Sequence, residues 1–358
     1  MKKIVFIINH PIDIVFALSI IKELSLAESE ILVFDHKYFN SDIYEFIKRS
    51  KIDFTLLEQP EYLTNIYKGF RKSIKFINYL KKKFNENILI ITFSKFELYI
   101  DLLNKHFKNH ISILQPGSTV NDFNKNELEV FYKYKIRRNI YEFLFNLTRT
   151  NPYRLKSTKS IVLFDKLSKN TEIFLSNNKN RNSNEITFPF SIKEEKLKHP
   201  NTIVVFGSRF LEWEYFDSKK IDILNDFLEN LKSSFPEFKF IYVKHPLENR
   251  EYEFLNINEF EIIENSINAE MIFYEMGHKI HSVYSIGSTS SKTAFEFGIR
   301  SHVIYKSFKF ENSVEKVYNR IFNGYPKNFF IVNNEIKSYT TTKKMDLKNL
   351  EVLLWKVQ

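Results

Sequence analysis

Three segments in the second half of the sequence carry hydroxyl, basic or small residues directly after a short apolar run. They are Gly207-Ser208-Arg209, Lys244-His245-Pro246 and Gly287-Ser288-Thr289-Ser290-Ser291-Lys292. The first offers backbone amides, a hydroxyl and a cation, the second offers two side chains that can carry positive charge, and the third is rich in hydroxyls. Groups of these kinds bind phosphate oxygens. We therefore expect these segments to bind a phosphate-containing ligand.

The hydroxyl-rich segment precedes a predicted helix over 290–298. The first turn of a helix presents unpaired backbone N–H groups and a partial positive charge, so serines there can bind phosphate oxygens. The alternative is that the serines only cap the helix. His245 also has two interpretations, because a histidine at a strand end is either a ligand-binding residue or a structural or exposed one.

Short apolar runs alternate with amphipathic stretches in both halves of the chain, which predicts parallel sheets covered by helices. In the first half the predicted strands are 3–8, 31–34, 54–57, 88–92 and 111–114, and the predicted helices are 12–26, 41–50, 64–84 and 96–107. In the second half the predicted strands are 202–206, 238–243, 260–263, 282–286 and 301–305, and the predicted helices are 219–234, 268–277 and 290–298. Ligands of such sheets bind at the carboxyl ends of the strands.

The chain of 358 residues has room for two domains. Between the two alternating series, 120–160 is helical and basic, 161–164 has the pattern of a strand, and 176–184 is polar and turn-forming. We predict four parts, each named by its range. They are an N-terminal Rossmann-like domain over 1–160, an interdomain region over 161–200, a C-terminal Rossmann-like domain over 201–340 and a C-terminal helix over 341–358.

The second half resembles the bacterial sialyltransferases and polysialyltransferases in the order and spacing of its motifs. A strand ends at Lys244-His245-Pro246, Glu270 follows about 25 residues later, and a further strand ends at Gly287-Ser288-Thr289-Ser290-Ser291. The resemblance covers about residues 203–300. It implies the α/β architecture called GT-B, in which two Rossmann-like domains face a cleft. The C-terminal domain would then bind a nucleotide sugar, and the N-terminal domain would bind the acceptor.

The same resemblance implies an activity and roles for individual residues. The activity is inverting transfer of a sialic acid from a CMP-activated donor to a cell-surface glycan or lipooligosaccharide. His245 would contact the donor phosphate and aid the departure of CMP, and Glu270 would hold the ribose hydroxyls. Ser290 and Ser291 would bind the phosphate, with Ser288 and Thr289 as close alternatives. The predicted donor-binding set also includes Gly207, Ser208, Lys244, Pro246 and Gly287.

Related short motifs occur in CDP-glycerol phosphotransferases and capsule Kdo transferases, so other donors stay open. These are CMP-Kdo, CMP-linked pseudaminate or legionaminate, and CDP-glycerol. An alternative from another class is a non-catalytic nucleotide- or polyanion-binding protein.

The first domain departs from the pattern of these sialyltransferases at the position of the catalytic base. Many of them carry an acidic pair before a glycine at a strand end, where a carboxylate deprotonates the acceptor hydroxyl. The corresponding place is Gln115-Pro116-Gly117-Ser118, where neither glutamine nor proline can act as that base. The remaining candidates are His10, Asp13, Glu97 and Asp122. We favour Asp13 and His10, because the loop after the first strand normally faces the cleft.

The formal net charge of +10 favours polyanionic partners such as a nucleotide-sugar donor, an anionic membrane surface or nucleic acid. Nucleic acid is not expected, because no recognition module is present. The basic and aromatic stretch 125–159 is either a solvated helix pair or a segment that docks on an anionic membrane. Since the chain has no cysteine and no metal-ligand spacing, we expect neither a metal ion nor a cofactor.

The N-terminal apolar run is too short for a membrane span and lacks a signal-peptide cleavage site. We expect a cytoplasmic protein that can associate peripherally with the inner membrane.

Overall fold

The computed structural model describes thirteen stretches of the chain and a few residues between them. They are 3–35, 39–58, 66–84, 88–93, 109–114, 172–175, 185–186, 200–210, 216–245, 248, 251–264, 268–332 and 347–357, with 99, 102, 103, 106 and 107. The chain divides into two compact units. The first comprises Met1–Thr187 with Asp346–Gln358, and the second comprises Phe188–Met345.

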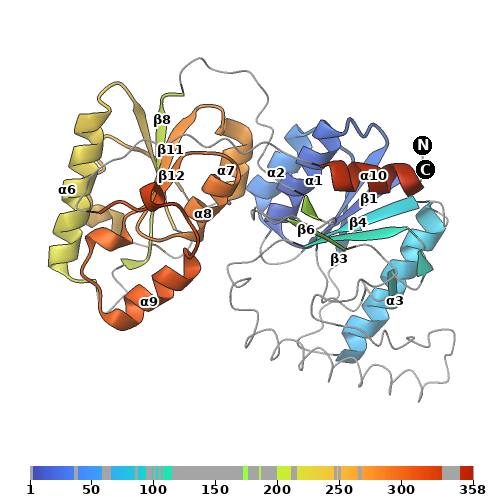
Figure 1. The fold of residues 1–358 in the computed structure, drawn as a ribbon. Coiled ribbons are helices and arrows are strands. Elements are labelled where there is room, and N and C mark those ends of the chain that lie inside the picture. Colours follow the sequence, from blue (N-terminus) through green and yellow to red (C-terminus); the bar gives the residue numbers. More distant parts are fainter. Residues whose placement is uncertain are drawn as a thin grey trace. The chain divides into compact units, whose positions relative to one another are not determined.

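The first unit contains a seven-stranded parallel sheet in the order β3-β2-β1-β4-β5-β6-β7 (Figure 1). Its strands are β1 (Lys3–Ile8), β2 (Ser29–Asp35), β3 (Phe54–Glu58), β4 (Ile88–Thr92), β5 (His110–Leu114), β6 (Glu172–Leu175) and β7 (Glu185–Ile186). The central strand β1 is apolar and buried from Ile4 to Ile8, as expected of a strand covered on both faces. The order of the first five strands is that of a Rossmann fold.

Among the described residues, the helices that accompany this sheet include α1 (Pro11–Glu23), α2 (Ser41–Arg49), α3 (Ile66–Phe84) and α10 (Lys348–Val357). Helix α1 starts with Pro11, whose missing N–H costs nothing at the first helical position. Helix α2 is capped by Asn40, whose side chain accepts a hydrogen bond from the backbone N–H of Ile43. Helix α10, from the far end of the chain, contacts β7.

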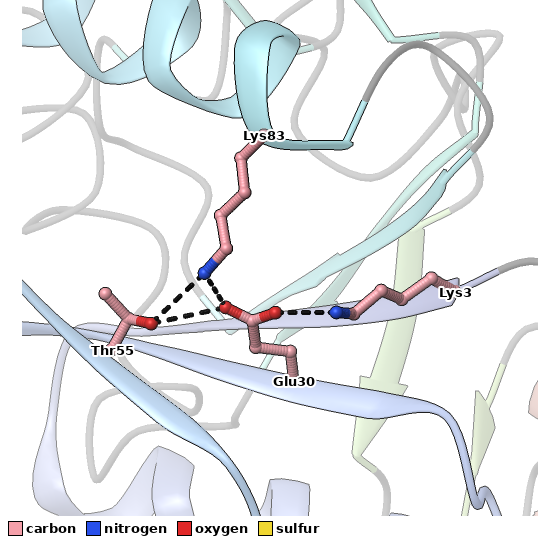
Figure 2. Close-up of polar contacts among 4 residues, drawn as sticks. All are labelled: Lys3, Glu30, Thr55 and Lys83. Atoms are coloured by element: carbon pink, nitrogen blue, oxygen red, sulfur yellow. Dashed lines mark hydrogen bonds and ion pairs between the residues drawn. The ribbon is translucent and has the colours of Figure 1, made fainter.

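A buried carboxylate joins strands and a helix at the amino-terminal edge of the first sheet (Figure 2). Glu30 of β2 pairs with Lys3 of β1 at 2.8 Å and with Lys83 of α3, and it accepts a hydrogen bond from Thr55 of β3 at 3.2 Å. Burial alone would raise the pKa of Glu30, but hydrogen bonds from Lys3 and Lys83 hold it below its usual range. Glu30 therefore fixes this edge, which lies opposite the carboxyl ends of the strands.

The second unit contains a five-stranded parallel sheet in the order β10-β9-β8-β11-β12. Its strands are β8 (Thr202–Phe206), β9 (Lys239–Val243), β10 (Glu261–Ile263), β11 (Ile280–Ser285) and β12 (Ser301–Val303). Its helices are α6 (Ser218–Ser234), α7 (Ala269–Met276), α8 (Thr289–Glu296) and α9 (Asn312–Ile321). The strand order again is that of a Rossmann fold. The predicted α/β class with two Rossmann-like domains is confirmed.

Two features of the fold differ from the sequence-based expectation. The region expected between the domains, 161–200, contributes the short strands β6 and β7 to the first sheet. Along the chain, the boundary between the two compact units falls between residues 187 and 188. Helix α9 was not predicted either, although Val314, Val317, Tyr318 and Ile321 have the spacing of an amphipathic helix. The strand expected at 161–164 and the basic stretch 125–159 lie outside the described residues.

In the part of the chain that the structure describes, no helix is both long and apolar enough to span a lipid bilayer.

Candidate functional site

The three phosphate-binding segments predicted in the second unit lie at one edge of its sheet. They follow β8, β9 and β11, and β8 is hydrogen-bonded to both of the others. Because all three strands are parallel, their carboxyl ends meet at the same edge. The backbone N–H of Gly207 donates to the carbonyl oxygen of Val243 at 2.8 Å, so the pairing of β8 with β9 continues to the start of these segments.

A cavity of about 20 Å³ lies at these strand ends, and its lining includes Gly207, Ser208, Tyr242 and Ser285. A space of this size holds about one water molecule. The cavity is therefore too small to hold a nucleotide. A hollow of about 510 Å³ lies at the amino-terminal edge instead, lined mostly by charged residues of α6, β9 and β10 that include the ion pair Lys232–Glu229.

His245 follows β9 and is half-buried. Its backbone N–H donates to Oε2 of Glu248 at 2.8 Å, and its carbonyl oxygen accepts from the backbone N–H of Glu248 at 2.8 Å. The hydroxyl of Tyr242 donates to the other carboxylate oxygen, Oε1, at 2.6 Å. Glu248 was not predicted as a site residue. Its only signal in the sequence is that an acidic residue stands three positions after His245. Pro246 lies outside the described residues.

Gly207 and Ser208 lie beside this cluster at the end of β8. A Cβ atom at Gly207 would lie 2.1 Å from Oε2 of Glu248 and 2.6 Å from the hydroxyl oxygen of Tyr242, so only glycine fits while these two side chains stay in place. Ser208 is buried, and Arg209 after it is half-buried. The backbone of β8 thus approaches the His245 turn closely.

Lys244 has a partner of its own. Its ammonium binds both carboxylate oxygens of Glu264, at 2.9 and 3.2 Å, and Glu264 follows β10. This ion pair draws the Lys244 ammonium toward β10 and partly neutralises it. Donor binding by Lys244 stays a prediction.

The hydroxyl-rich segment after β11 is held by hydrogen bonds within the segment and to strands β11 and β12. Ser288 is the N-cap of α8, and its side chain accepts from the backbone N–H of Ser290 at 3.1 Å. The Ser285 hydroxyl accepts from the backbone N–H of Ser288 at 2.9 Å and pairs with the Ser291 hydroxyl at 2.8 Å. The fully buried Ser291 hydroxyl also reaches the carbonyl oxygen of His302 at 3.2 Å. Ser288 and Ser291 therefore shape the loop.

The other members of this segment lie nearer the surface. Thr289 is exposed, and Ser290 is half-buried. Their hydroxyls are thus the better placed ones to meet a ligand. At Gly287 a Cβ atom would lie 2.4 Å from the ring of Tyr318, so the backbone packs directly against α9.

This division between buried and surface hydroxyls predicts different outcomes for two neighbouring substitutions. Ser291→Ala is expected to lower the free energy of unfolding by about 1–3 kcal/mol, because it leaves buried polar partners without their hydrogen bond. Ser290→Ala is expected to change it by less than about 0.5 kcal/mol. Urea unfolding of the two variants measures both values, and an equal loss of stability would contradict the division.

Two histidines lie on neighbouring strands of the second sheet, the half-buried His281 on β11 and the fully buried His302 on β12. His302 contacts the carbonyl oxygen of Asn328 through Nδ1 at 2.9 Å and stacks on the Tyr284 ring, and His281 Nε2 lies 2.9 Å from Arg300. Burial lowers the pKa of each imidazole from 6.5 to about 4, and the charge of Arg300 adds to this.

These histidines predict a loss of stability in acid. Between pH 6.5 and about 4 each imidazole binds a proton in the unfolded chain but not in the folded one, so the free energy of unfolding falls as the pH is lowered through this window. The slope is at most about 1.4 kcal/mol per pH unit for each histidine. Urea unfolding from about pH 7.5 to 4.5 measures it, and a His281→Gln/His302→Gln variant should show a flatter pH dependence than the parent.

Glu270 is in the first turn of α7, beside α8. Its carboxyl group is buried although other atoms of the residue are partly exposed, and burial raises its pKa. Hydrogen bonds from its own backbone amide and from the Thr293 hydroxyl of α8 offset part of that rise. Glu270 thus lies next to the helix that the hydroxyl-rich segment opens, and ribose binding by Glu270 stays a prediction.

In the first unit, Asp13 and His10 follow β1 at the carboxyl edge of its sheet. Oδ2 of Asp13 accepts from the backbone N–H groups of His10 at 2.8 Å and Asn9 at 3.1 Å, which caps the start of α1. Asp13 is 3% exposed, and burial raises its pKa to about 7, although the two backbone hydrogen bonds lower it. His10 is exposed. The other base candidates, Glu97 and Asp122, and the segment 115–118 lie outside the described residues.

Within the described residues, no group of three or more histidine, aspartate or glutamate side chains is arranged to hold a metal ion.

No protein-family model matches the sequence, and a search of curated proteins finds no significant match. Solved structures that match the chain include an α/β-galactoside α-2,3-sialyltransferase from Photobacterium phosphoreum, with 14% identity and a TM-score of 0.48 over 93% of this chain and 98% of that one. They also include UDP-GlcNAc 2-epimerase from Neisseria meningitidis, with 11% identity and a TM-score of 0.46 over 87% and 84% of the two chains. Acinetobacter baumannii MurG shows 11% identity and a TM-score of 0.39 over 90% and 82%.

At these identities and TM-scores, no activity is transferred from these proteins to this chain.

Proposed function

We propose that this protein is an inverting glycosyltransferase that moves a sialic acid, or a related nonulosonate, from a CMP-activated donor to a glycan acceptor. One observation carries the proposal. Three neighbouring strand ends of the second unit bring a glycine-serine-arginine segment, His245 and the hydroxyls of Thr289 and Ser290 to one edge. Glu270 lies beside the helix that the third segment opens. Cations, hydroxyls and a carboxylate in this arrangement suit a phosphate and a ribose.

The proposed step breaks the bond between the anomeric carbon and a phosphate oxygen of CMP. Negative charge grows on that phosphate as the bond breaks, and hydrogen-bond donors or cations aimed at it lower the barrier. His245, Arg209 and Ser290 supply donors of this kind, so the step needs no bound metal ion. CMP leaves as the new bond forms between the anomeric carbon and the acceptor oxygen on the opposite face.

The acceptor oxygen must lose its proton during the step. Asp13 is the favoured base, because a base works best when its pKa lies near the working pH, and burial raises the pKa of Asp13 to about 7. His10, in the same loop, is the alternative. The proton passes from the acceptor hydroxyl to this base and then to water.

A donor screen tests the proposal. Thermal unfolding of the full chain is measured with CMP, CMP-sialic acid, CMP-Kdo, CDP-glycerol and UDP-GlcNAc, and a ligand present at about 100 times its Kd should stabilise by about 2.7 kcal/mol. We expect CMP and CMP-sialic acid to raise the Tm. We also expect the protein to transfer sialic acid from CMP-sialic acid to a glycan acceptor. Stabilisation by CDP-glycerol or CMP-Kdo alone would assign the other donor, and CMP binding without hydrolysis or transfer would assign a non-catalytic nucleotide-binding protein.

The proposal also includes a place for the reaction. A glycan acceptor carried on lipid would be met by a cytoplasmic enzyme at the inner membrane surface, and the net charge of +10 suits anionic lipids. Co-sedimentation with vesicles of anionic and neutral lipid tests this association.

A further inference from the structure

Glu248 is a buried acidic residue at the carboxyl edge of the second sheet, with 6% of its surface exposed. A carboxylate loses its hydration when it is buried, and this is costly unless hydrogen bonds replace the water. Each of its two oxygens has such a bond, from the Tyr242 hydroxyl at 2.6 Å and from the backbone N–H of His245 at 2.8 Å. Glu248 is therefore tied both to strand β9 and to the segment that follows it.

The contacts of Glu248 also close the turn that carries His245. The backbone N–H of Glu248 donates to the carbonyl oxygen of His245, and the Glu248 carboxylate accepts from the backbone N–H of His245. Glu248 therefore bonds both backbone polar groups of His245. On the other side, the Glu248 carboxylate fills the space that a side chain at position 207 would need. One side chain thus fixes the end of β9 against the end of β8.

We propose that Glu248 is a positioning residue, which holds His245 and the Gly207 backbone in the arrangement that binds the donor phosphate. The inference rests on the proposed function for the identity of the ligand. Glu248 acts through His245, because its carboxylate oxygens accept from the Tyr242 hydroxyl and from the His245 backbone. The hydrogen bonds, more than the negative charge, hold the turn.

This distinction makes two substitutions at position 248 informative. Glu248→Gln keeps an oxygen that accepts from the His245 N–H and an amide that donates to the Tyr242 hydroxyl oxygen, whereas Glu248→Ala keeps neither. We expect Glu248→Ala to weaken CMP binding about tenfold and to speed hydrogen exchange of the His245 amide about tenfold, which are the effects of one lost buried hydrogen bond. Glu248→Gln should stay within about threefold of the parent in both measurements.

Tyr242→Phe provides a matched control in a double-mutant cycle. The tyrosine hydroxyl bonds Oε1 of Glu248, whereas the His245 N–H bonds Oε2, so we expect the effect of removing the hydroxyl on the His245 segment to depend on Glu248. We expect Tyr242→Phe to weaken CMP binding in the parent and to have no further effect in the Glu248→Ala background.

Calorimetric titration with CMP and amide hydrogen exchange, both on the full chain, test the inference. If Glu248→Ala leaves CMP affinity and His245 exchange unchanged, the inference is wrong. It is also wrong if the glutamine variant fails as the alanine variant does while exchange rises throughout the second unit, since Glu248 would then only stabilise the fold. If the parent binds no CMP, the proposed ligand is wrong, and local exchange at His245 alone decides whether Glu248 holds this turn.

Discussion

Replacement of His245 by alanine is expected to lower kcat for sugar transfer by a factor of about 10² or more, while the second unit stays folded. The imidazole is half-buried at the strand-end site, and its backbone is already fixed by Glu248. The substitution removes the donor that is proposed to stabilise the departing phosphate but leaves the hydrogen bond between the His245 backbone and Glu248. Steady-state kinetics with a CMP-activated donor measure the loss, and the Tm measures folding.

His278 offers a matched control for this substitution. It lies in the turn before β11, at the amino-terminal edge of the same sheet, and it is half-buried like His245. We expect His278→Ala to leave kcat within about twofold of the parent. If His245→Ala retains full transfer activity, or if both variants lose activity equally, the assignment of His245 to the donor phosphate is wrong.

The sheets could be predicted from the sequence because their signal is local. Strands such as Ile88–Thr92 and Thr202–Phe206 are continuous apolar runs, and a run of that kind is buried wherever it occurs in a parallel sheet. The strands β6 and β7 had no such signal, because they are four and two residues long and begin with glutamate. The place of β6 in the sheet comes from pairing with β5, which is far away in the chain, and β7 in turn pairs with β6.

The site could be predicted only down to its segments. Strand-end position and residue type indicated Gly207-Ser208-Arg209, the His245 segment and the hydroxyl-rich loop, and the structure brings all three to one edge. The sequence did not reveal which hydroxyl of that loop is buried, because Ser290 and Ser291 are adjacent and chemically identical. Their environments differ because α8 turns Ser291 toward Ser285 and His302. Glu248 was missed for a similar reason, since its role depends on contacts with two other strand ends.

Asp13, the proposed base, also has a structural role. Its carboxylate caps α1, which by itself explains an acidic residue in the first turn. Burial that raises its pKa to about 7, however, makes the charged form costly at neutral pH. A cap does not need such burial, because Asp217 caps α6 while exposed and has a lowered pKa caused by its bonds with Lys220.

Replacement of Asp13 by asparagine is therefore expected to separate activity from stability. As the base of the transfer step, Asp13 would contribute a factor of about 10² to 10⁴ to kcat, which asparagine removes. Asparagine still accepts the N–H groups of His10 and Asn9 through its side-chain oxygen, so α1 keeps its cap. We expect kcat for transfer to fall by a factor of at least about 10². The free energy of unfolding at about pH 8 should equal that of the parent or exceed it.

The pH dependence gives this prediction its sign. The pKa of Asp13 is about 7 in the folded protein and 3.8 in the reference state, so the protonated carboxyl favours folding in acid, and this contribution is lost as the pH rises from about 4 to 7. The asparagine side chain does not titrate, so the stability of Asp13→Asn relative to the parent should increase over this window and level off above it. Asp217→Asn, at the exposed cap, should show no such increase. Thermal unfolding of the three proteins from about pH 4.5 to 8.5 measures the differences. Full activity in Asp13→Asn would assign the base to His10 or to another residue, because a neutral amide cannot take the acceptor proton.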